Sequence, residues 1–148
     1  MFIKNFKVLP LVFILLSIIA ENSIASYWVF VTSNEDAEIF VDMQSLQIHE
    51  RDVKVWEKWV NIRPKEVKDS SLKNTYNLEL NLSLYHCDES TYHLLKIDRY
   101  SDQKGSLMLM ESYSYPETPP YKLKIMPDSV VSQVMDFVCG VKKTPKQR

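Results

Sequence analysis

Residues 78–84 read Leu-Glu-Leu-Asn-Leu-Ser-Leu, with a leucine at every second position and a polar residue between each pair. A period of two matches a β-strand, because successive side chains of a strand point to opposite faces of the sheet. The stretch therefore predicts a strand with one buried leucine face and one face in contact with water, as is typical of antiparallel sheets.

Five further segments have strand character, because they are rich in β-branched and aromatic residues. They are residues 27–31, 39–41, 53–62, 92–100 and 107–113. The segments follow one another at short spacing without helices between them, so we expect an antiparallel meander of about six strands. Gly105 is placed to form a bulged turn between the last two. The polar segment 65–74 and the proline-rich segment 116–120 are expected to be irregular.

The end of the chain has a helical pattern instead. Pro127-Asp128-Ser129 supplies a start and a cap, and the apolar residues at 130, 131, 134, 137 and 138 recur at helical spacing. Gly140 is expected to end the helix in a left-handed conformation. The predicted fold class is therefore α+β, an antiparallel sheet with one C-terminal helix. The basic tail, residues 141–148, is expected to be disordered.

Residues 1–25 are typical of a cleavable export signal. Lys4 and Lys7 precede an apolar run at 8–20, and Ser23-Ile24-Ala25 is a small-x-small cleavage site, so cleavage is expected between Ala25 and Ser26. The apolar run is too short to cross a bilayer of about 30 Å as a helix. Cleavage of 25 of the 148 residues leaves 123, enough for one domain at 26–140 and its tail. We expect an exported protein, in the periplasm or at the cell surface, with no membrane span after cleavage.

Export determines how the two cysteines are interpreted. An oxidising compartment favours a disulfide over free thiols, so we predict a bond between Cys87 and Cys139 that joins a strand end to the helix end. One difficulty is that Cys87 is odd-numbered and the leucines are even-numbered. Either the helix lies on the face opposite the leucines, or a bulge near residues 85–86, or the end of the strand, reverses the alternation. We favour the bulge or the strand end.

Composition excludes several kinds of function. Loss of Lys4, Lys7 and Glu21 with the signal leaves 16 basic and 18 acidic residues and a net charge of −2, so no strong field attracts nucleic acid. The chain has only two glycines, which excludes glycine-rich phosphate-binding loops. No cofactor is expected.

The polar residues do not predict catalysis or metal binding. His86 and His93 lie near Asp88 and Glu89, but they lack a recognised ligand spacing, and an oxidised Cys87 is no metal ligand, so no metal site is predicted. A triad of Ser90, His93 and Asp98 lacks a nucleophile elbow, so no catalytic residue is predicted. Aromatic residues at 56, 59, 113, 115 and 121 could form a binding platform, and we favour their ordinary role in sheet and core.

The order of certain residues resembles the bacterial surface-adhesin protein E-like family. The matching features are Trp28 after the signal, Val41-Asp42, Ser45-Leu46, the strand Val53–Trp56, Cys87 at a strand end, Tyr100 before a turn, and the helix from Pro127 to Cys139. The resemblance covers nearly all of residues 27–139. It implies a curved sheet whose C-terminal helix is tethered by the disulfide, a homodimer, and binding to host matrix or serum proteins. The chain departs from the family in its proline-rich segment 116–120 and in its basic tail.

The sequence thus predicts an exported protein that binds a protein partner and is not an enzyme. One helix covers only part of one sheet face, so the remaining apolar surface must be curled inward, buried in a homodimer or offered to a partner. The alternative is a periplasmic inhibitor or accessory factor for an envelope enzyme. In that case the segments 65–74 and 116–120 would be its inserting loops.

Overall fold

The computed structural model describes residues 26–67, 74–103, 106–117 and 122–143. Its strands form one antiparallel sheet: β1 (Trp28–Ser33), β2 (Ala37–Asp42), β3 (Gln47–His49), β4 (Asp52–Glu66), β5 (Thr75–His86), β6 (Thr91–Gln103), β7 (Ser106–Ser114) and β8 (Leu123–Lys124). Six of them lie in the order β1-β2-β4-β5-β6-β7, and the short strands β3 and β8 pair with β4 and β6. The α+β class and the six-stranded meander are confirmed. The two short strands were not predicted.

Helix α2 (Val130–Lys143) follows β8. Ser129 caps it, because its Oγ accepts a hydrogen bond of 3.1 Å from the backbone N–H of Ser132. The helix continues through Gly140, so the prediction that this glycine ends it was wrong. A glycine inside a helix costs only about 1 kcal/mol, which a helix packed against a sheet readily tolerates.

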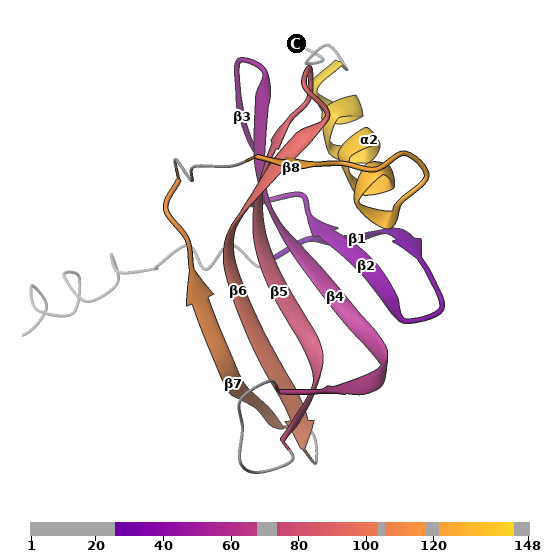
Figure 1. Ribbon diagram of the computed structural model, residues 1–148, viewed down its shortest axis with the longest axis vertical. Helices are drawn as coiled ribbons and strands as arrows, with labels where there is room; N and C mark the ends of the chain where they lie inside the picture. The colour runs from indigo at the N-terminus through magenta and orange to yellow at the C-terminus, as the bar shows by residue number, and fades with distance from the viewer. Residues whose placement is uncertain (1–25, 68–73, 104–105, 118–121, 144–148) are drawn as a thin grey trace, which may run out of the picture.

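One end of the sheet carries the core (Figure 1). We call the sheet face that contacts α2 the inner face and the opposite face the outer face. The inner face of β2 and β4 contributes fully buried aliphatic side chains, which pack with Val134 and Val138 of α2. The members from β2 and β4 are Ala37, Ile39, Val41, Val53 and Val55. The helix lies near β1, and the long lower parts of β4 to β7 extend beyond it.

The leucine stretch in β5 faces away from the helix. Strand β5 pairs with β4 without a shift from His86 to Leu78, so the even-numbered leucines lie on the outer face and are half-buried. Between Leu78 and Tyr85 the buried residues are Asn81, Ser83 and Tyr85, all on the inner face. The prediction of a buried leucine face was therefore wrong. The physical reason is that the core is filled by aliphatic side chains of β2, β4 and α2, while β5 contributes one aromatic ring and small or polar groups.

The same register resolves the position of Cys87. The favoured bulge near residues 85–86 is absent from the pairing of β4 with β5, but the strand end named with it is present, because β5 ends at His86 and Cys87 follows it. The helix lies on the face opposite the leucines, as the alternative stated. A bulge does occur nearby, but on β6, where Leu82 pairs with Lys96 and Ser83 with Leu94, so that Leu95 is the extra residue.

Several predictions fall outside the described residues. These are the signal at 1–25, the turn glycine Gly105, and the greater part of the segments 65–74, 116–120 and 141–148. Within the described part of the chain, no helix is both long and apolar enough to span a membrane.

Candidate functional site

The disulfide is the first feature of the region where sheet and helix meet. Cys87 directly follows β5 and is bonded to Cys139 of α2, with their Cα atoms 5.8 Å apart. The pair is separated by 52 positions in the sequence, so the bond closes a long loop. The predicted pairing is confirmed.

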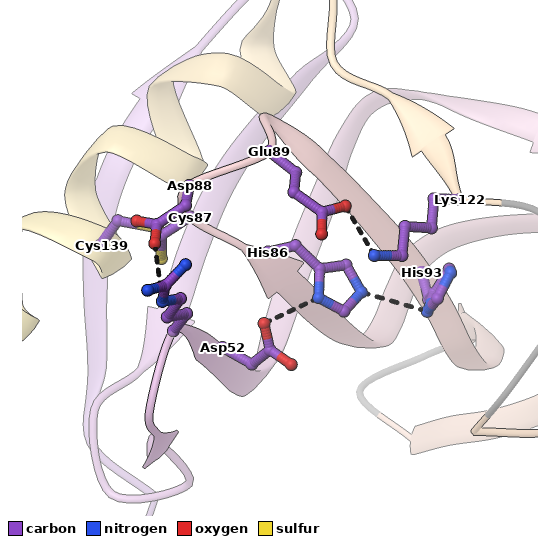
Figure 2. A network of polar contacts seen from close by, with 9 residues as sticks. Asp52, His86, Cys87, Asp88, Glu89, His93, Lys122 and Cys139 are labelled. Atoms are coloured by element: carbon purple, nitrogen blue, oxygen red, sulfur yellow. Dashed lines mark hydrogen bonds and ion pairs between the residues drawn. A yellow bond between two sulfur atoms is a disulfide. The ribbon is translucent and has the colours of Figure 1, made fainter.

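A short chain of polar side chains lies beside the disulfide (Figure 2). Asp52 of β4 contacts His86 of β5, with 2.7 Å between Oδ1 and Nδ1, and His86 contacts His93 of β6, with 3.4 Å between Nε2 and Nδ1. The two rings are 9% and 6% exposed. Nε2 of His93 is buried and has no hydrogen-bond partner among the described residues. Burial, followed by the proximity of His86 and Lys122, lowers the pKa of His93.

The acidic neighbours of the two histidines form separate ion pairs at the surface. Asp88 pairs with Arg51 at 3.2 Å, and Glu89 pairs with Lys122 at 2.6 Å. Within the described ranges, no three histidine, cysteine, aspartate or glutamate side chains are grouped so that they could hold a metal ion. The sequence combination of Ser90, His93 and Asp98 is not assembled either, because Asp98 contacts Lys96 and Ser112 while His93 contacts His86.

A second polar network lies on the inner face, beyond the helix. Glu57 of β4 is 2% exposed and accepts hydrogen bonds from the Tyr85 hydroxyl at 2.6 Å and from the Trp59 indole N–H at 2.9 Å. Burial raises the pKa of Glu57, and the hydrogen bonds oppose that rise. Burial and the nearby Glu57 raise the pKa of Tyr85 as well.

A separate group of ion pairs is centred on Arg99 of β6. Its Nε lies 2.7 Å from Glu79 of β5, and one terminal nitrogen lies 2.9 Å from Glu111 of β7. Burial works against the charge of Arg99, but the hydrogen bonds to both carboxylates raise its pKa above the usual value. The three strands are thereby joined side by side through one guanidinium group.

No sequence pattern predicts the contacts of Arg99. Glu79, Arg99 and Glu111 occur singly on three strands, and they meet only because the register places Glu79 opposite Arg99 and Arg99 opposite Glu111. The two tryptophans considered for an aromatic platform have different surroundings. Trp59 packs against the core, whereas Lys96 lies over the ring of Trp56.

Comparison with known protein families shows which family this chain belongs to. Residues 28–140 match the model of the family described as surface-adhesin protein E. The chain belongs to the surface-adhesin protein E family. The match includes every described strand and most of α2. A comparison with curated proteins finds no match.

A solved structure agrees with the family assignment. The chain is similar to the crystal structure of protein E from non-typeable Haemophilus influenzae, with 12% sequence identity and a TM-score of 0.53. The similarity covers 80% of this chain and 79% of that one. At this identity the likeness shows the shared fold alone. Membership of a surface-adhesin family indicates an exported or surface protein.

The Arg99 network gives a test of the inner face in this family member. Arg99→Met removes the charge between Glu79 and Glu111, whose side chains are 17% and 9% exposed. We expect the free energy of unfolding to fall by about 2–3 kcal/mol, because two partly buried carboxylates lose their shared cation. Urea denaturation measures the loss.

The matched control is Arg51→Met, which breaks an ion pair whose side chains are 80% and 58% exposed. Exposed pairs contribute about 0–1 kcal/mol, so this variant should unfold almost like the wild type. Equal losses in the two variants would show that the inner network contributes no more than a surface pair.

Proposed function

We propose that this protein E family member is an exported adhesin that binds a protein partner along the exposed edge of β7. The observation that supports the proposal is the apolar run at residues 107–110. Leu107, Met108 and Leu109 are 60%, 52% and 52% exposed, although they lie on a nine-residue strand at the end of the sheet. Exposed apolar edge strands are prone to pair with another chain.

The two edges of the sheet differ in a way that favours β7. At the other edge, β1 has a register shift between Phe30 and Thr32, and its Thr32 hydroxyl hydrogen-bonds Gln133 of α2. The helix thus lies beside β1. Strand β7 has a bulge at Met110 but contains no lysine, arginine or proline, the residues that commonly protect edges. Its one charged residue, Glu111, is directed to Arg99.

An edge of this kind fits an extended segment of a partner protein. Added strands obtain affinity from backbone hydrogen bonds and specificity from alternate side chains. We infer that the partner is a host matrix or serum protein, since the family is one of surface adhesins. The alternative is that a second copy of this chain binds the same edge and forms a homodimer. Sedimentation of the purified chain distinguishes a monomer with a free edge from such a homodimer.

A double substitution, Leu107→Lys with Leu109→Lys, tests the proposed edge. Lysine on an edge strand opposes strand addition, and these exposed positions have little influence on the core. The chain from Ser26 is applied to immobilised matrix and serum proteins, and binding is measured by surface plasmon resonance. We expect the double variant to bind at least about 10-fold more weakly than the wild type, a loss of about 1.4 kcal/mol.

The matched control is Ile48→Lys on β3, which is also exposed but lies at the other end of the sheet. This variant should bind like the wild type. If the β7 double variant retains full affinity, the binding edge is wrong; if the wild type binds none of the proteins, the adhesin function is wrong.

Cell fractionation distinguishes the surface-adhesin hypothesis from the alternative of a periplasmic inhibitor. Degradation of the protein by protease added to intact cells supports a surface adhesin. Release only after osmotic shock, together with protection in intact cells, supports the periplasmic alternative. The same samples reveal by mass spectrometry whether the chain begins at Ser26, as the signal prediction requires.

A further inference from the structure

The two buried histidines lie next to the weakest attachment of the sheet. Among the described residues, β8 pairs with β6 through two residue pairs, Leu123 with Tyr92 and Lys124 with Thr91. His93 is the next residue of β6. The remaining attachments are the ion pair of Lys122 and the buried side chain of Ile125, whose N–H donates to Ser90 at 3.0 Å. We call residues 122–125 the strap.

The hydrogen-bonding chain allows only some protonation states. The carboxylate of Asp52 accepts a hydrogen bond from Nδ1–H of His86, so the contact between His86 Nε2 and His93 Nδ1 needs one proton between the two nitrogens. The pair satisfies this condition when it is neutral and when it carries one positive charge. Two fully protonated rings would point N–H groups at each other across 3.4 Å, so the second charge breaks the contact.

The charges around the pair have both signs. Asp52 from β4 and Glu89 from the turn before β6 attract positive charge, whereas Lys122 before β8 repels it. Arg51 and Asp88 form an exposed pair nearby. Burial is the largest effect and, with His86 and Lys122, keeps the pKa of His93 below its usual value. The unfolded chain therefore binds more protons than the folded one just below the ordinary histidine pKa of about 6.5, and protonation of His93 opposes its folded position as the pH falls.

We propose that His86 and His93 form an acid-sensitive latch, in which protonation of both rings separates them and releases the strap from β6. The strap responds before the rest of the sheet because its backbone pairing with β6 has two residue pairs, whereas β5 and β6 share nine. The disulfide at Cys87 keeps α2 attached while the strap is released. The latch is independent of the proposed binding edge on β7.

Hydrogen–deuterium exchange of the oxidised chain from Ser26 tests the latch. Exchange is compared at about pH 7.5 and about pH 5, after correction for intrinsic rates. We expect protection of the strap, residues 122–125, to fall at least about 10-fold at the lower pH, while β4 stays protected. His93→Gln removes the titrating ring and should abolish this loss. His49→Gln, at an exposed position of β3, should preserve it.

If His93→Gln fails to fold, a second measurement tests the latch in the wild type. Proton NMR of the wild-type imidazoles should show His93 titrating below the ordinary histidine pKa of about 6.5. The latch is refuted by an unchanged strap in the wild type, by equal pH dependence in folded His93→Gln, or by a His93 pKa at or above the ordinary histidine value of about 6.5.

Discussion

Replacement of Cys87 and Cys139 by alanine is expected to lower the free energy of unfolding by about 4 kcal/mol. The bond spans 52 positions, and in the chain-entropy model closure of such a loop restricts the unfolded chain by this amount. The helix should be affected most, because α2 contains five valines and a glycine and has low intrinsic helix propensity. Urea denaturation of the oxidised wild type and the double variant measures the difference.

Reduction of the wild type with dithiothreitol is the matched control for the cysteine variant. The reduced protein should unfold at nearly the same urea concentration as the double variant, because both lose the same constraint. If both differ from the oxidised protein by less than about 1 kcal/mol, the sheet holds α2 without covalent help.

Replacement of Tyr85 by alanine is expected to cost about 4 kcal/mol, whereas replacement of the neighbouring Leu84 should cost only about 1 kcal/mol. Tyr85 is 1% exposed on the inner face, stacks on Tyr92 and donates to Glu57, so its loss leaves a cavity and removes a donor. Leu84 is half-buried on the outer face. The comparison tests which face of β5 is the core.

Tyr85→Phe separates the contribution of the ring to the free energy of unfolding from the contribution of the hydroxyl. It preserves the stacking and removes only the hydrogen bond to the buried Glu57, so we expect a loss of about 1–2 kcal/mol. Urea denaturation of the three variants gives the order. A greater loss in Leu84→Ala than in Tyr85→Ala would mean that the helix covers the leucine face.

Local patterns predicted the elements well. The alternation at residues 78–84, the aromatic and β-branched runs and the Ser129 cap each depend on neighbours in the sequence, and each marked a real strand or helix. The disulfide was predictable because export leaves two cysteines with one way to pair. The short strands β3 and β8 hold three and two residues, too few for a periodic pattern.

Properties that depend on register were not predictable. A period of two indicates two different faces, but the face that becomes the core depends on where the aliphatic residues of β2 and β4 meet α2. The same limit applies to Arg99, whose partners on β5 and β7 become neighbours only once three strands are aligned. The contact between His86 and His93 likewise requires the turn that brings β5 against β6.

Hydrogen–deuterium exchange of the chain from Ser26, free and bound to the matrix or serum protein that it holds most tightly, tests the binding proposal most directly. We expect new protection on binding to be concentrated in β7, residues 106–114, as an added strand occupies the open edge. Unchanged exchange in β7, with protection appearing over α2 or β3 instead, would contradict the proposal.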